Sequence, residues 1–136
     1  MIPYINLTAT WALFGLIWVT QIVTYPGFMD VGVDSFKVYH QNYMGAITLV
    51  VMPLMLTELG VGCWLVWHNH FHWEWLIPLI LVGIIWASTF FLQVPMHETL
   101  VKGKDTDVIH SLVQTNWIRT IAWTLKAAWL THFIMR

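Results

Sequence analysis

Charged residues are scarce in this sequence. Asp, Glu, Lys and Arg together make up 10% of its 136 residues, against about 25% in an average soluble domain. Hydrophobic residues make up 58%, and a short chain buries a smaller share of its apolar surface than a long chain does. An ordinary soluble domain is therefore excluded, and the composition predicts a protein whose solvent is largely the lipid bilayer.

Cysteine and excess positive charge are also lacking. Cys63 is the only cysteine, which excludes an internal disulfide and a cysteine-rich zinc or iron–sulfur site. Six basic residues stand against seven acidic ones, so there is no basic surface for a nucleic-acid backbone, and nucleic acid is not an expected partner. Tryptophan is abundant, with ten residues, and Trp and Tyr collect at membrane interfaces.

Four apolar segments are long enough for the roughly 20 residues that cross a bilayer. They cover residues 6–25, 44–67, 75–92 and 116–135. Residues 26–43 mix charged and apolar side chains and are expected to lie in the headgroup region, whereas residues 93–115 are too polar for lipid. The sequence predicts one all-α transmembrane domain over residues 1–136, a four-helix bundle with a short interfacial segment between its first two helices.

An even number of spans places the connections 26–43 and 93–115 on one side of the membrane, here called the loop side. Four of the six basic residues lie near it, namely Lys37, Lys102, Lys104 and Arg119. Positive charge is enriched on the cytoplasmic side of membrane proteins. We therefore expect an integral protein of a bacterial inner membrane, with the loop side in the cytoplasm.

Two charged residues fall deep inside the expected spans. With a rise of about 1.5 Å per residue, Glu58 lies roughly 20 Å from the loop-side start of the second span, and Lys126 lies roughly 15 to 18 Å from that of the fourth. A charge in lipid is costly unless it is paired. The two residues either form a buried ion pair that orients the helices, or each reaches the far interface separately, Lys126 by snorkelling.

Other polar residues meet at one level near the loop side. Asn116, Arg119 and Trp123 share a face of the fourth helix at about 100° per residue, and Gln21 and Tyr25 lie one turn apart on the first helix at the same depth. We predict a polar pocket there. Its expected lining is Gln21, Tyr25, His40, Gln93, His97, Asn116 and Arg119, with Trp117 and Trp123 as apolar walls.

Simpler explanations stay open for some of these residues. Tyr25 and Trp117 also fit an aromatic belt at the membrane interface, and Asn116 also fits the cap of a helix. Arg119 has no such explanation, because a helix end in lipid needs no inward-pointing charge. Arg119 is therefore the residue on which the predicted pocket depends.

The histidines fall into two groups. His68, His70 and His72 alternate in the turn between the second and third spans, a spacing that fits copper or zinc; the tryptophans around them favour a simple interfacial turn instead. His40 and His97 lie near the predicted pocket, and histidine is the usual proton carrier near neutral pH. Each fits a general base, a haem or metal ligand, or a structural residue.

Four sequence blocks resemble one protein family. They are YPGF (25–28), FKVYHQNYM (36–44), QVPMHETLVKGKD (93–105) and LVQTNWIRTIAW (112–123). In this order they resemble the small four-helix membrane proteins of a domain-of-unknown-function family that includes the anthrone oxygenases. The resemblance implies His40, His97, Asn116 and Arg119 as catalytic residues.

The resemblance also implies a reaction. The characterised branch of that family oxidises polycyclic phenolic anthrones to quinones with dioxygen and without an obvious bound cofactor. Applied to this sequence, His97 or His40 is the base, and Arg119 holds the anion with Asn116 and Gln93 as neutral donors. Gln21 and Tyr25 complete the substrate site, and Trp117 and Trp123 stack on the substrate ring.

Three functions stay open at this point. The first is a membrane oxidoreductase for a lipophilic aromatic or quinone-like substrate. The second is a noncatalytic accessory subunit of a respiratory or photosynthetic complex, packed on larger membrane subunits or in a homo-oligomer. The third is a haem or copper carrier. Because the three functions differ in the cofactor they need, the sequence leaves the cofactor open. The inward polar cluster favours the first, because a helical spacer does not need one.

Overall fold

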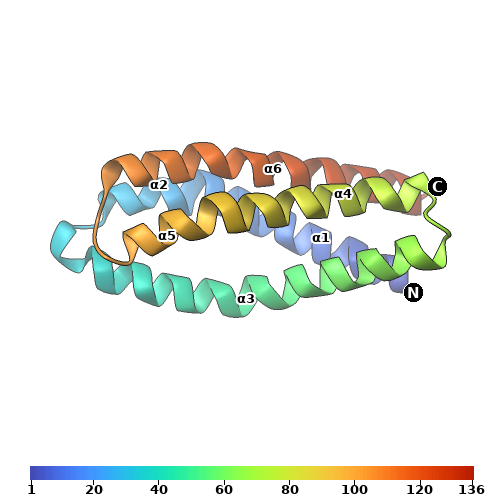
Figure 1. The fold of residues 1–136 in the computed structure, drawn as a ribbon, viewed down its shortest axis with the longest axis horizontal. Helices are drawn as coiled ribbons and strands as arrows, with labels where there is room; N and C mark the ends of the chain where they lie inside the picture. The colour runs from blue at the N-terminus through green and yellow to red at the C-terminus, as the bar shows by residue number, and fades with distance from the viewer.

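The computed structural model describes residues 1–136 as four long helices, each antiparallel to the next along the chain (Figure 1). The first is built from α1 (Ile2–Val19), the π-helix η1 (Thr20–Thr24), α2 (Tyr25–Gly27) and the 3-10 helix η2 (Phe28–Asp30). The second is α3 (Val33–His68). The third is built from α4 (Trp73–Ser88), the π-helix η3 (Thr89–Gln93) and α5 (Val94–Leu100), and the fourth is α6 (Thr106–Ile134).

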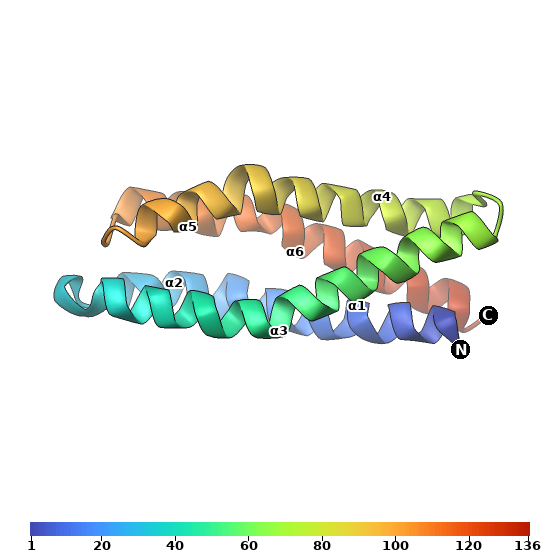
Figure 2. The same cartoon turned by 60° about the horizontal axis from the view of Figure 1, so that its bottom comes forward.

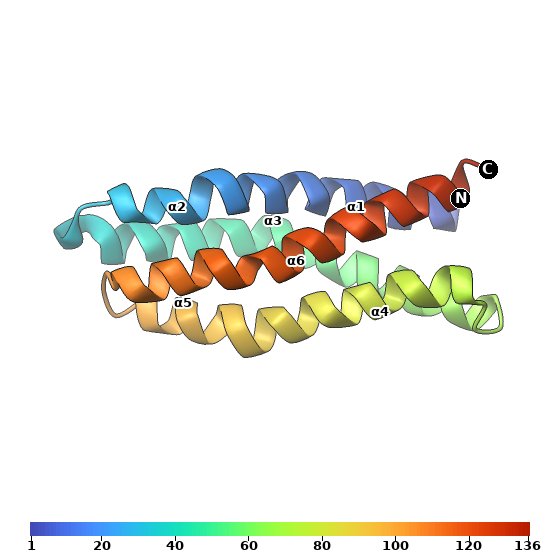
Figure 3. The ribbon, with the colours of Figure 1, turned by 90° about the horizontal axis from the view of Figure 1, so that it is seen from above.

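The helices form a bundle in which α1 packs on α3 and α6, and α4 packs on α6 and α3. Both termini and the turn of residues 69–72 lie at one end, and the loop side lies at the other (Figure 1). Along its length α3 crosses from the side of α1 toward α4 (Figure 2). In the same way α6 crosses from α5 toward α1 (Figure 3). Near the loop side, side chains connect α3 to α5, with His40 Nε2 3.0 Å from His97 Nδ1.

Three of the long helices can cross a membrane. Ile2–Asp30, Val33–His68 and Trp73–Leu100 are long and apolar enough to do so. Large apolar side chains also point outward, such as Leu49 and Phe91, which are 78% and 79% exposed. These features agree with an integral membrane bundle. The fourth helix, α6, is less apolar, and its span over residues 116–135 stays a prediction.

The expected interfacial segment at residues 26–43 is not a separate element, which corrects the sequence prediction. The second helix starts at Val33 and runs unbroken to His68, so the connection after η2 is only residues 31–32. The physical reason is a buried face on these first turns: Phe36 and His40, one turn apart, are both 0% exposed. This segment therefore continues α3 and buries one face against the bundle, while most of its other residues are exposed.

The connection expected at residues 93–115 is also shorter than predicted. The third helix continues to Leu100, and α6 begins at Thr106. Its N-cap is Asp105, whose carboxylate accepts hydrogen bonds from the backbone N–H groups of Asp107 and Val108 at 3.1 Å. The helix cap considered for Asn116 is therefore wrong, because Asn116 lies in the middle of α6.

A compact apolar cluster closes the loop side of the bundle. This loop-side core consists of Tyr25, Phe28, Phe36, Leu100, Ile109 and Leu112. Outside it, the ammonium group of Lys104 donates to the backbone carbonyls of Met29 and Val31, at 2.6 and 2.7 Å. The two loop-side connections are therefore tied to each other above a sealed apolar layer.

Deeper in the bundle, Glu58 and Lys126 form the buried ion pair that was one of the two alternatives from the sequence. Lys126 Nζ lies 2.6 Å from Glu58 Oε1, and the two side chains are 1% and 0% exposed. Lys126 also donates to Asn6 Oδ1 and Thr10 Oγ1, at 3.1 and 2.8 Å. Snorkelling of Lys126 to the far interface is excluded, and the pair connects α1, α3 and α6.

Candidate functional site

Two π-helical turns, η1 and η3, lie on parallel helices of the bundle. Each begins with a threonine that is followed six residues later by a proline: Thr20 and Pro26 in the first, Thr89 and Pro95 in the second. A proline has no N–H, and its ring pushes away the carbonyl four residues earlier. In both turns the residue before the proline donates its N–H to the threonine carbonyl, five residues back. Such π-turns occur frequently at functional sites.

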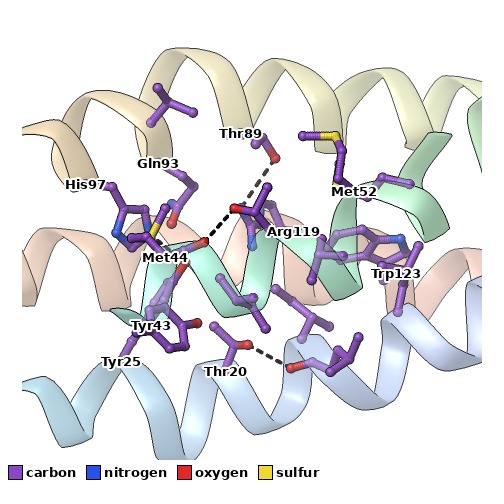
Figure 4. Close-up of a pocket in the computed structure, with 18 residues that line it drawn as sticks. Thr20, Tyr25, Tyr43, Met44, Met52, Thr89, Gln93, His97, Arg119 and Trp123 are labelled. Carbon is purple, nitrogen blue, oxygen red and sulfur yellow. Dashed lines mark hydrogen bonds between the residues drawn. The ribbon is translucent and has the colours of Figure 1, made fainter. Parts of the chain in front are cut away.

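A cavity of about 150 Å³ lies between the π-turns, α3 and α6 (Figure 4). Its polar lining is contributed by Thr20, Tyr25, Tyr43, Thr48, Thr89, Gln93, His97 and Arg119. Its apolar lining is contributed by Leu13, Leu16, Ile17, Met44, Ile47, Val51, Met52, Met55, Val94 and Trp123. His97, Gln93 and the two tyrosines lie toward the loop side, and Trp123 lies at the opposite end (Figure 4). The cavity is therefore polar at one end and apolar at the other.

A chain of hydrogen bonds starts at the polar end of the cavity. The hydroxyl of Tyr25 lies 3.0 Å from His97 Nε2, and His97 Nδ1 lies 3.0 Å from His40 Nε2. Each of these groups can both donate and accept a hydrogen bond. The direction of donation along the chain therefore determines which ring nitrogen of each histidine carries the proton. His40 is 0% exposed, and its Nδ1 atom has no hydrogen-bond partner. The chain thus runs from the cavity into the loop-side core.

Arg119 brings a positive charge into the cavity without a matching negative charge. It donates a hydrogen bond from Nη1 to Thr89 Oγ1 at 3.4 Å, and its Nε atom is buried without a partner. Its guanidinium group lies 5.7 Å from the ring centroid of Trp123. Beside it, Gln93 Oε1 is also buried without a partner. A cation placed in this way favours an anionic or oxygen-rich ligand in the cavity.

Gln21 and Asn116 form a separate network next to the cavity. Gln21 Oε1 accepts from Asn116 Nδ2 at 2.8 Å and from Thr120 Oγ1 at 3.0 Å, while Gln21 Nε2 donates to the carbonyl of Val113 at 3.0 Å. These bonds join α6 to the first long helix. Neither Gln21 nor Asn116 lines the cavity, so their hydrogen bonds support its walls.

The structure brings most of the predicted site residues together. Five of them line the cavity, namely Tyr25, Gln93, His97, Arg119 and Trp123. His40 lies one hydrogen bond behind the lining. Trp117 does not contribute, because its ring is 39% exposed on the outside of the bundle and packs on Trp18 with 5.7 Å between centroids.

Sequence reasoning missed four polar residues of the lining: Thr20, Tyr43, Thr48 and Thr89. The repeated spacing from threonine to proline marks the first and the last of them. Tyr43 lies one turn after His40 on the same face of α3, a relationship that helical periodicity can also detect.

The histidines do not form a metal site in this structure. His68, His70 and His72 do not gather into a group that could hold a metal ion; His68 stacks on Trp64 at 4.6 Å, and His72 contacts Glu74. His40 Nε2 and His97 Nδ1 lie 3.0 Å apart and are hydrogen-bonded to each other.

No family model, curated protein or solved structure matches this chain. The fold and the cavity alone therefore define what it is: a four-helix bundle with membrane-length apolar helices and a partly polar cavity between them.

Proposed function

We propose that this chain is a membrane oxidoreductase that oxidises a lipophilic phenol to a quinone with dioxygen. The observation that carries the proposal is the pairing of Arg119 and His97 in one cavity. Arg119 supplies a cation without a partner, and His97 supplies a ring nitrogen that a second histidine holds in place. The resemblance to the family of the anthrone oxygenases supports the same chemistry, because the enol form of an anthrone is a phenol.

The proposed reaction oxidises the ring carbon para to the hydroxyl group of the substrate, so that its C–H becomes C=O. A base removes the phenolic proton, and the phenolate gives one electron to dioxygen. The two radicals combine to form a C–O bond, and the peroxide takes up a proton. The para hydrogen then leaves as a proton, the O–O bond breaks, and hydroxide departs. In sum, a phenol and dioxygen give a quinone and water.

The residues of the cavity divide this work among them. His97 Nε2 bonds to the Tyr25 hydroxyl at 3.0 Å, so the phenolic proton passes through that hydroxyl to His97, which acts as the positioned general base. Arg119 lies where the phenolate oxygen develops its charge, and a preorganised cation in a water-poor site stabilises such charge strongly. Gln93 Nε2 already donates to Thr115 Oγ1 at 3.0 Å, and its free Oε1 accepts a hydrogen bond from the phenol hydroxyl before the proton leaves. Trp123 forms the apolar floor under the ring.

The test uses the full chain in lipid nanodiscs with anthrone and, separately, with a phenol that carries a prenyl chain. Dioxygen labelled with oxygen-18 should put one labelled atom into the quinone and one into water. Arg119→Gln should lower kcat/KM by about 10²- to 10³-fold, and His97→Ala by about 10²- to 10⁴-fold. Arg119→Lys keeps the charge and should retain part of the activity.

Trp117→Phe is the matched control, because it changes an aromatic residue of α6 that lies outside the cavity. It should leave turnover unchanged. Quinone formation no faster than the protein-free background with both substrates would overturn the proposal. Full activity in both Arg119→Gln and His97→Ala would do the same.

A further inference from the structure

We infer that the substrate enters this cavity from the bilayer, through a slot between α3 and α5, and that it has one aromatic ring and an apolar tail. The inference rests on the proposed function and specifies its substrate class. It depends on three features of the cavity: where it is closed, where it is open and how large it is.

The cavity is closed toward the loop side. Phe28, Phe36 and Leu100 of the loop-side core are each 0% exposed, and they lie between the His40–His97 pair and the loop-side water. The Lys104 ammonium group ties the two connections together over this layer. A water-soluble substrate therefore has no direct path from the loop side to His97.

The cavity is open toward the lipid. Three of its lining residues are also exposed on the outside of the bundle: Met52 at 39%, Val94 at 37%, and Thr48 one turn before Met52. They belong to α3 and α5, which contact each other on the loop side of these residues through His40 and His97. These residues border a slot on the outer surface of helices that are long and apolar enough to cross a membrane.

The volume of the cavity sets the size of what it can enclose. An engineered cavity of about 150 Å³ in another protein holds one benzene molecule, whereas pockets for drug-sized ligands measure roughly 300–1,000 Å³. The cavity here measures about 150 Å³, like the engineered cavity that holds benzene. One aromatic ring fits inside with its oxygen toward His97 and Arg119, and the rest of the molecule must pass between Met52 and Val94 into the lipid.

Binding in lipid nanodiscs tests this inference without requiring turnover. The probes are a phenol with a prenyl chain, the same phenol without the chain, and anthrone, each measured as ligand retained per protein. We expect the prenylated phenol to bind about tenfold or more tightly than the other two. Thr48→Trp and Val94→Trp fill the slot from opposite edges and should weaken this binding by about tenfold.

Leu49→Trp is the matched control for both variants. Leu49 adjoins Thr48 on the same helix, is 78% exposed and does not line the cavity, so its replacement should leave binding unchanged. A thermal melt verifies that each variant is folded. Equal binding of the phenols with and without the chain, tighter binding of anthrone, or unchanged binding in both folded slot variants would overturn the inference. A prenylated phenol that binds as expected but is not oxidised would count against the proposed function alone.

Discussion

Trp123 donates a hydrogen bond from its indole Nε1 to Glu58 Oε2 at 3.1 Å. The same ring lies under the guanidinium group of Arg119 at 5.7 Å and forms the apolar end of the cavity. Trp123 is 1% exposed. One side chain therefore separates the buried ion pair from the cavity while it contacts both, which allows the structural role of the pair to be tested separately from the chemistry of the cavity.

Trp123→Phe should reduce stability more than activity. The substitution keeps a ring beneath Arg119 but removes the donor to Glu58, and the loss of a buried hydrogen bond to a charged group costs about 1.5–3 kcal/mol of the free energy of unfolding. Turnover should fall less than about tenfold, because the cation and the base remain. Denaturation in mild detergent and steady-state kinetics measure the two effects. A variant of unchanged stability would show that the bond to Glu58 contributes nothing.

Breaking the ion pair should destabilise the bundle, whereas removing both partners should not. Lys126→Met leaves the Glu58 carboxylate buried opposite only the Thr10 hydroxyl and the Trp123 indole. Removal of one partner of such a pair costs about 3–5 kcal/mol of unfolding free energy, while replacement of both by apolar residues is often neutral. Lys126→Met combined with Glu58→Leu should therefore recover most of the loss. If the double variant unfolds as readily as Lys126→Met alone, the cost does not arise from an uncompensated charge.

The sequence predicts the bundle well because lipid imposes a simple rule on it. Apolar runs long enough to cross a bilayer must become helices, since every backbone polar group needs a partner there. The ends of the helices are less predictable. Asp34 and Lys37 made the start of the second helix resemble an interfacial segment, although Phe36 and His40 on its other face are buried.

The site was predictable to the extent that it depends on helical periodicity. The depth of each residue along its helix and the helical face it occupies predict Tyr25, His97 and Arg119 at one level of the bundle. The structure places all three in the cavity. The partners of each residue were not predictable in this way. Gln21 bonds to Asn116 instead of Arg119, because the π-turn that follows Val19 rotates the next residues away from the positions of an ideal α-helix.

His40→Phe should lower the rate of the chemical step without weakening substrate binding. His40 does not line the cavity, but it is the only hydrogen-bond partner of His97 Nδ1. Its loss frees the orientation and tautomer of His97, and a misplacement of about 1 Å can cost about 10²-fold in rate. We expect kcat to fall by about this factor while KM stays unchanged.

The control for this variant is His110→Phe, because His110 is exposed at the start of α6. It should have wild-type kinetics. A rise in KM with constant kcat in His40→Phe would place His40 in substrate binding instead, and normal kinetics would remove it from the site.

Pro95→Ala should make the third long helix more regular at the expense of the cavity. The substitution restores an N–H and removes the ring that clashes with the carbonyl four residues earlier, a defect that costs about 3 kcal/mol inside a helix. The turn of η3 can then close to α-helical geometry, which rotates Thr89 and Gln93 relative to His97. We expect the free energy of unfolding to stay constant or rise. Turnover should fall about tenfold or more, since Thr89 and Gln93 no longer point into the cavity with His97.

Pro3→Ala is the control, because a proline in the first turn of α1 displaces no hydrogen bond. Undiminished turnover in a stabilised Pro95→Ala protein would show that the π-turn does not shape the site.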